Sequence, residues 1–176
     1  MDYIVRGGNW YFDALNAWRV LDEVTLPELT FNTEDFVPGG HNMAVAWPEE
    51  MQPLKATIKL KSDDPRVRGL CGREPGAYVT ATYYENLRSF RDGTNRGRVI
   101  LLKGLLNSVK PDARKGVKAS GTEYEFSTIV RYEDVTGGAV THRFDQFAGP
   151  GATIVGGVAL FAEMATNLAI SGGTAL

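Results

Sequence analysis

The sequence predicts a mainly β protein with an antiparallel sheet and two short helices. Segments of alternating hydrophobicity recur along the chain, the middle part is rich in β-branched and aromatic residues, and turn signals separate consecutive segments. Strands that follow one another through hairpin turns pair antiparallel. The four long segments at 78–90, 98–109, 122–132 and 139–147 should therefore form one antiparallel sheet.

The N-terminal part is expected to add shorter strands. Segments 9–12 and 17–24 flank a turn at 13–16. Segment 26–31 continues in an extended conformation, and Pro27 marks a break or a sheet edge there.

Segment 55–61, KATIKLK, alternates cleanly between apolar and polar residues. Ala56, Ile58 and Leu60 point to one side, whereas the lysines and Thr57 point to the other. This pattern predicts a half-buried strand.

A short helix is expected after this strand. Asp64 suits the N-cap, Pro65 suits the first helical position, and Gly72 can end the turn. The residues that would pack on the sheet are Val67, Leu70 and Cys71.

In the third long segment, TEYEFSTIVRY, alternate residues are expected to share one face. These residues are Tyr124, Phe126, Thr128, Val130 and Tyr132. The EDVTGG sequence that follows predicts a hairpin turn, and the polar stretch 110–121 predicts a loop.

The C-terminal part changes period. We expect a short strand at 153–155 and then an amphipathic helix at about 158–169, which Gly172 and Gly173 would stop. Its apolar stripe consists of Phe161, Met164, Ala165 and Leu168. A terminal helix of this kind usually closes one end of a core.

The length of 176 residues suits a single domain, 1–176. One cysteine excludes an internal disulfide and a thiolate metal cluster. No apolar run reaches the roughly 18 residues of a membrane span, and the N-terminus lacks the layout of a secretory signal. We therefore expect no membrane partner and a cytosol-like compartment.

Charge is unevenly distributed, although the net charge is only −2. Segment 20–52 contains acids and no lysine or arginine, and segment 88–118 is strongly basic. The acids are Asp22, Glu23, Glu28, Glu34, Asp35, Glu49 and Glu50, and the bases are Arg88, Arg91, Arg96, Arg98, Lys103, Lys110, Arg114, Lys115 and Lys118. These blocks are either two solvated faces or two complementary surfaces that meet between copies of the protein.

Segment 33–53, TEDFVPGGHNMAVAWPEEMQP, is unusual. Prolines and a Gly-Gly pair make it too broken for a core helix or strand, yet it is too apolar for an ordinary solvent loop. Its apolar side chains are Phe36, Val37, Met43, Val45, Trp47 and Met51. A structureless stretch of this length inside a domain is usually functional.

No residue pattern predicts a catalytic, cofactor-binding or metal-binding site. The glycine-rich stretches match neither a phosphate-binding loop nor a dinucleotide fingerprint, and His41 and His142 lack metal-site spacing. Cys71 reads as a core thiol. Aromatic residues alternate with charged ones in the middle strands, but on the face expected to be core, which disfavours single-strand nucleic-acid binding. We predict no enzyme activity and no cofactor.

Taken in order, six segments resemble the major tail tube protein of contractile-tailed bacteriophages. They are IVRGGNWYFD, EVTLPELTFNTEDFVPGG, MQPLKATIKL, RGRVILLKGLLNSV, KGVKASGTEYEFSTIVRYE and ATIVGGVALFAEM. The segments run in family order across almost the whole chain. One departure is the less polar C-terminal helix segment.

The resemblance implies an antiparallel β-sandwich or partial barrel with a short flanking helix and a C-terminal helix. It also implies homohexameric rings that stack head to tail into a hollow tube, through which genomic DNA passes during ejection. Segment 33–53 would be an arm that reaches neighbouring subunits. Further implied partners are the tail sheath, the baseplate or initiator protein, the terminator, and, in the lumen, the tape measure protein and DNA bound without sequence specificity. The protein would reside in the virion tail after assembly in the host cytoplasm.

Head-to-tail stacking needs two different matching surfaces. The charges expected to supply them are Asp22, Glu23, Glu34, Asp35, Glu49, Glu50, Arg91, Arg96, Arg98 and Lys115.

Three alternatives remain open at this point. The chain could be the tube subunit of a phage-derived bacteriocin or of a related secretion system. It could be a monomeric β-sandwich module that binds a small ligand or peptide. It could be a hydrolase that uses Cys71, alone or with His142, or a carboxylate pair.

Overall fold

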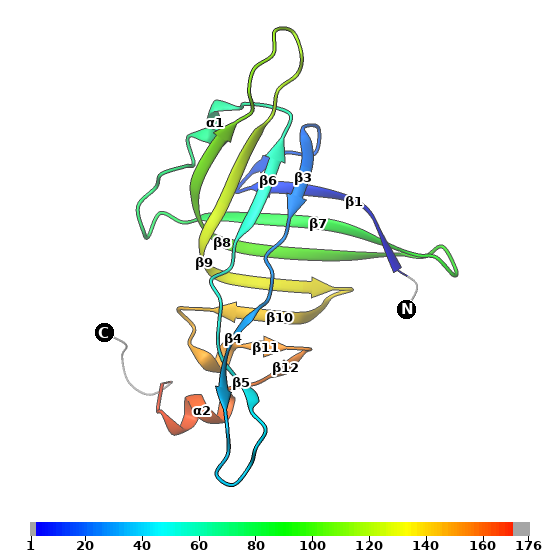
Figure 1. The fold of residues 1–176 in the computed structure, drawn as a ribbon. Coiled ribbons are helices and arrows are strands. Elements are labelled where there is room, and N and C mark those ends of the chain that lie inside the picture. Colours follow the sequence, from blue (N-terminus) through cyan, green and yellow to red (C-terminus); the bar gives the residue numbers. More distant parts are fainter. Residues whose placement is uncertain (1–2, 171–176) are drawn as a thin grey trace.

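Two packed sheets and a protruding hairpin make up the structure, a computed structural model that describes residues 3–170 (Figure 1). The strands are β1 (Tyr3–Phe12), β2 (Leu15–Asn16), β3 (Leu21–Thr25), β4 (Phe31–Phe36), β5 (Val45–Met51), β6 (Ala56–Leu60), β7 (Val79–Ser89), β8 (Asn95–Pro111), β9 (Thr122–Thr136), β10 (Ala139–Asp145), β11 (Ile154–Val155) and β12 (Val158–Ala159). The helices are α1 (Pro65–Arg68), α2 (Ala162–Asn167) and the 3-10 turn η1 (Pro150–Ala152). The predicted fold class, mainly β with antiparallel pairing and short helices, is confirmed.

The long strands β8 and β9 belong to both sheets. The larger sheet has the order β12-β11-β10-β9-β8-β7-β1-β2, whereas the first half of β9 also pairs with β6, and β6 pairs with β3. This gives a smaller sheet of order β8-β9-β6-β3, seen as four neighbouring strands in the upper half of Figure 1. Strands that bend from one sheet into the other are typical of orthogonal packing.

The bend in β8 and β9 depends on Gly104. The β8–β9 register shifts between Lys103 and Leu105, and Thr128 opposite has a positive φ of 50°. A Cβ atom at Gly104 would lie 2.9 Å from the carbonyl oxygens of both Ser127 and Thr128. Only glycine allows the two strands to approach this closely.

This irregularity corrects one prediction for β9. Tyr124, Phe126 and Tyr132 are buried as expected, but Thr128 is exposed. Three residues of β9, 128–130, lie opposite the single residue Gly104, and this bulge interrupts the alternation, so Thr128 does not share the core face.

The core lies between the two sheets. Trp10 and Phe12 of β1 pack from the larger sheet, with ring centroids 5.8 Å apart, and Phe12 lies 6.1 Å from Tyr124 of the smaller sheet. All three side chains are fully buried. In β6 the predicted half-buried strand is confirmed, because Ala56, Ile58 and Leu60 are buried and Lys59 is not.

The predicted short helix is also confirmed. The Asp64 carboxylate accepts a hydrogen bond from the Arg66 backbone N–H at 2.9 Å, and Pro65 opens α1. Val67 and Leu70 are buried against the sheet.

The C-terminal part differs from the prediction. Val158 and Ala159 form β12, which pairs with β11 across Gly156 and Gly157. Both glycines have positive φ, 61° and 82°, as a tight hairpin turn requires. The helix is therefore reduced to α2.

The expected role of this helix is wrong as well. The predicted stripe lies largely in solvent, with Phe161, Met164 and Leu168 exposed to 39%, 42% and 62%. The helix packs on η1 and contributes no buried residue, so it does not close the core. Its predicted stop at Gly172 and Gly173 lies outside the described residues.

Segment 33–53 is also more regular than expected. Strands β4 and β5 pair antiparallel as a separate two-stranded sheet. Pro48 lies within β5 opposite Thr33, which a ribbon without a third strand tolerates. Near the N-terminus, the first strand extends back to Tyr3, and β3 begins only at Leu21.

Candidate assembly surfaces

The smaller sheet has two open edges within the part of the chain that is described. Strand β3 pairs with β6 alone. Beyond the bend, β8 pairs with β9 on one side, and its other side carries a single bridge from Cys71 to Leu106. Open strand edges are templates for pairing with another chain.

The edges of the larger sheet are better protected. It ends in two strands of only two residues, β2 and β12. The rest of the β1 edge is interrupted by a register shift between Val5 and Gly8. Very short edge strands and bulges are devices that prevent edge pairing. The smaller sheet is therefore the better candidate for joining copies.

The polar face of the smaller sheet carries alternating charges. Glu23 of β3 lies opposite Lys59 of β6, Lys59 lies opposite Glu123 of β9, and Glu123 lies opposite Lys110 of β8. The next row consists of Thr25, Thr57, Glu125 and Ser108. The sequence does not predict this arrangement. The alternation through β6 places Lys59 and the flanking Lys55 and Lys61 on a polar face, but it does not show which residues the register brings beside them.

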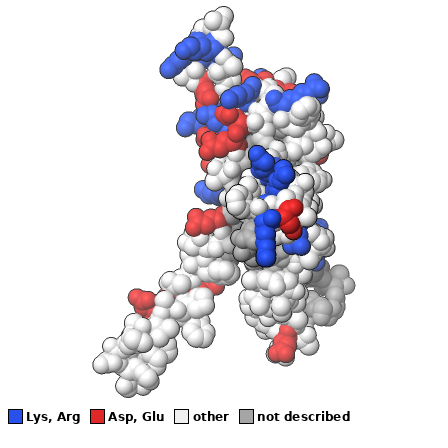
Figure 2. Space-filling view, turned by 90° about the vertical axis from the view of Figure 1, so that its right-hand side faces the viewer, with Lys and Arg blue, Asp and Glu red and all other residues white. Residues whose placement is uncertain are grey.

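The β4–β5 hairpin projects from the body rather than folding back over it (Figures 1 and 2). Five of its six predicted apolar residues are between 49% and 69% exposed: Phe36, Val37, Met43, Val45 and Trp47. The sixth, Met51, is partly buried at the hairpin base.

A cleft of about 560 Å³ lies between the hairpin base and the body. Its apolar lining includes Met51, Pro53, Leu54, Ile129, Tyr132 and Phe144. Figure 2 shows the hairpin diverging from the lower body. The cleft exposes part of the inner face of the larger sheet, which the smaller sheet does not cover.

Arg98, predicted to be a stacking charge, pairs within its own chain instead. Its guanidinium lies 3.2 Å from Glu85 and 2.6 Å from Asp134. Both carboxylates are buried. Hydrogen bonding to Asp134 raises the pKa of Arg98, and charge attraction from Asp134 and Glu85 acts in the same direction. Arg98 thus has two carboxylate partners within its own chain.

The other predicted stacking bases lie in two separate places. Arg91 and Arg96 lie at the β7–β8 turn, where the Arg96 guanidinium lies 5.3 Å from the centre of the Tyr3 ring. Lys115 lies in the 112–121 loop at the top of Figure 1, far from that turn. The basic block of the sequence is thus not one surface.

The predicted acids also divide. Asp22 and Glu23 belong to β3, and Asp22 pairs with Lys61 at 3.0 Å. The hairpin carries the other four: Glu34, Asp35, Glu49 and Glu50. Among the described residues these four form no ion pair. The pKa of Glu50 is lowered, chiefly because the Asn32 amide donates to it at 2.7 Å.

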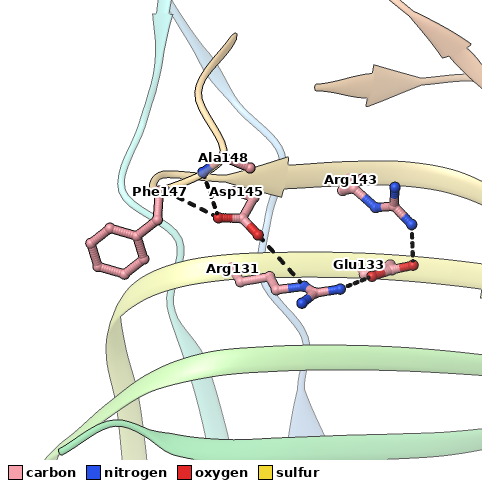
Figure 3. Close-up of polar contacts among 6 residues, drawn as sticks. All are labelled: Arg131, Glu133, Arg143, Asp145, Phe147 and Ala148. Carbon is pink, nitrogen blue, oxygen red and sulfur yellow. Dashed lines mark hydrogen bonds and ion pairs between the residues drawn. The ribbon is translucent and has the colours of Figure 1, made fainter. Parts of the chain in front are cut away.

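A second charged network ties β9 to β10 (Figure 3). Glu133 accepts hydrogen bonds from Arg143 at 2.7 Å and from Arg131 at 2.8 Å, which lower its pKa in that order. Asp145 lies 3.8 Å from Arg131 and accepts from the backbone N–H groups of Phe147 and Ala148. Because every member is paired with a neighbour, the network locks two strands rather than offering a reactive group.

The residues considered for catalysis are not brought together. Cys71 lies beside Leu106 of β8, whereas His142 lies on β10 opposite Asp134 and Val155. Residues 3–170 contain no group of three potential metal ligands. In the same range no helix has the length and apolarity to cross a membrane.

The family model described as phage tail tube protein FII matches residues 2–168. A solved structure with a similar fold is the sheath–tube complex of an extracellular contractile injection system, PVC, in its extended state. The TM-score is 0.54 at 9% identity, covering 73% of this chain and 87% of that one. No curated protein sequence matches. Since the family model spans nearly the whole chain, the protein belongs to the phage tail tube protein FII family and is a structural subunit of a tail tube.

Proposed function

We propose that six copies of this chain close into a ring, that rings stack head to tail as the inner tube of a contractile tail, and that DNA passes through the bore. The single observation that carries this proposal is the four-stranded smaller sheet with an open edge at each end.

Ring closure joins β3 of one copy to the part of β8 beyond the bend, residues 105–111, of the next copy. Strands β8, β9, β6 and β3 alternate in direction, so a β3–β8 contact between copies continues the antiparallel pattern. Joining the edges also removes them, which prevents uncontrolled pairing.

The size of such a ring suits DNA. Six copies supply 24 strands at about 4.8 Å spacing, and a tilt of about 40° makes the circumference about 150 Å. The backbone diameter is then about 48 Å. Side chains occupy about 5 Å on each side, which leaves a bore of about 38 Å.

Stacking places the hairpin of one copy against the 112–121 loop of a copy in the next ring. The two elements lie at opposite ends of the molecule (Figure 1). The hairpin has four carboxylates without ion-pair partners in residues 3–170, and the loop carries Lys115 and Lys118. In this assignment Arg98 is no longer a stacking charge. The stacking bases are those of the loop, and Arg91 and Arg96 belong to a different surface.

The remaining assignments follow from the tube role. The chain acts as one domain, 1–176, with the β4–β5 hairpin as its inter-subunit arm. The outer surface contacts a sheath, as the sheath–tube complex with a similar fold suggests. Initiator, terminator and tape measure proteins bind the tube, which assembles in the host cytoplasm and becomes part of the virion tail. The role is structural, without catalysis.

Negative-stain microscopy of the purified protein tests the proposal. We expect hexameric rings and hollow tubes. A single monomeric species at every concentration by light scattering contradicts it and supports a monomeric ligand-binding module instead.

The stacking contact has its own test. Lys115→Glu with Lys118→Glu should leave rings intact but shorten tubes, most clearly at low salt, where surface charges are least screened. Arg91→Glu with Arg96→Glu changes the net charge equally and should have the smaller effect. If the second pair shortens tubes more, the β7–β8 turn is the stacking surface.

A further inference from the structure

The polar face of the smaller sheet carries a charge row that is complete except at its two ends. Lys59 has a carboxylate on both sides, Glu23 and Glu123, and Glu123 has a lysine on both sides, Lys59 and Lys110. Glu23 and Lys110 each lack one neighbour, because they lie on the two open edges.

Nearby ion pairs neutralise the other lysines of this face. Lys55 lies 3.8 Å from Glu125, and Lys61 lies 3.0 Å from Asp22. Lys59 also approaches Asp112, at 3.5 Å. Glu23, Lys59 and Glu123 line a common hollow with Thr25 and Thr57. The face is thus densely charged but internally balanced.

This face points into the bore if the proposed ring is correct. The opposite face, with Ile58, Tyr124 and Phe126, is buried against the larger sheet. Turning the larger sheet inward would remove about 10 Å on each side and reduce the bore to about 18 Å, too narrow for a hydrated duplex. The larger sheet therefore lies outside.

We propose that Glu23, Lys59, Glu123 and Lys110 form a continuous ring of alternating charge on the bore wall, in which Lys110 pairs with Glu23 of the neighbouring copy. The inference rests on the proposed ring. Every lysine of the row then lies between two carboxylates. Double-stranded DNA meets no unneutralised cation there, so the wall does not hold its phosphates, which isolated lysines bind strongly.

Zero-length carbodiimide cross-linking tests the contact between copies, since it joins only a lysine and a carboxylate in direct contact. In assembled rings we expect a Lys110–Glu23 cross-link between copies, identified by mass spectrometry after mixing isotopically light and heavy protein. A Lys59–Asp112 cross-link within each copy, whose groups lie 3.5 Å apart, should form in rings and monomers alike and serves as the internal control.

The DNA-sliding role is tested with tubes of the Glu23→Gln, Glu123→Gln double variant. Removing both carboxylates leaves Lys110 with no row neighbour of opposite charge, and Lys59 with Asp112 alone. We expect these tubes to retain at least about tenfold more short duplex DNA than wild-type tubes at low salt, with the excess lost at high salt. The Glu28→Gln, Glu74→Gln variant changes net charge equally at exposed residues and should behave like wild type.

The outcomes are distinguishable. If wild-type protein forms no rings, the proposed function fails. If rings form without the Lys110–Glu23 cross-link, or if both glutamine variants retain equal amounts of DNA, the ring of alternating charge is wrong while the tube role stands. Should the double variant not assemble, Glu123→Gln alone, which retains the contact between copies, is expected to show the same increase, and no increase overturns the inference.

Discussion

Arg98 shows how a residue that belongs to a charged block can have an internal role. Glu85 and Asp134 are buried on the core-facing side of β7 and β9. One guanidinium between them satisfies two buried carboxylates. Removing one partner of such a cluster leaves uncompensated buried charge, which costs more than the pairing itself contributes.

We predict that Arg98→Leu lowers the free energy of unfolding by about 3 kcal/mol, measured by urea denaturation. Arg91→Leu, at an exposed turn position, should change it by less than about 0.5 kcal/mol. Adding Glu85→Leu and Asp134→Leu to Arg98→Leu should restore part of the loss. No restoration would mean that Arg98 acts through packing and not through charge.

We predict that the stability of the β7–β8 turn depends on pH through Asp92. Hydrogen bonding with Ser89 and then with Thr94 lowers its pKa from 3.8 to about 2. Because the folded pKa lies below the unfolded one, the stabilisation is complete above about pH 4 and is lost as the pH falls through 2. NMR titration of the Thr94 amide, whose N–H lies 3.1 Å from Asp92, should show a midpoint near 2. A midpoint near 3.8, or an unchanged titration in Asp92→Asn, contradicts this.

At the scale of elements, the bend shared by β8 and β9 decides the architecture. It lets β8 and β9 contribute to both sheets. It also places the second half of β8, which is paired only on its β9 side apart from one bridge, at the end of the smaller sheet. Gly104 is the residue on which the bend depends, because its position is closed to a side chain by two carbonyl oxygens.

We predict that Gly104→Ala destabilises the protein by about 1–3 kcal/mol, since the backbone of β9 must move to accept a methyl group. Gly97→Ala, in the same strand but with no atom within 4 Å of the new Cβ, is the matched control. It should be neutral or stabilise by up to about 1 kcal/mol. Equal melting temperatures for the two variants would contradict the role of Gly104.

For the whole molecule, exposed apolar side chains and unpaired strand edges are concentrated on a few elements. The hairpin, the open β3 and β8 edges and the stripe of α2 all expose groups that a stable monomer usually covers. Assembly of identical copies in the proposed tube would bury them.

Trp47→Ala should therefore affect assembly and not monomer stability. The side chain is 64% exposed, so the unfolding free energy should change by less than about 0.5 kcal/mol. A tryptophan buried between copies is worth about 2 kcal/mol, which raises the critical concentration for tube formation at least about tenfold. Sedimentation measures that concentration. Asn42→Ala, in the same hairpin turn, is the control, and equal critical concentrations for both variants contradict the arm role.

Local patterns in the sequence determined the strands, the short helix after Asp64, the hairpin turns and the family, because alternation, capping and turn chemistry act over a few residues. The tertiary structure decided what depends on register and on distant neighbours. It placed Arg98 between buried carboxylates, moved Thr128 out of the core face, left α2 off the core and aligned Glu23, Lys59, Glu123 and Lys110 in one row. Residues far apart in the chain meet only when strands pair, and a bulge at a bend changes which of them face one another.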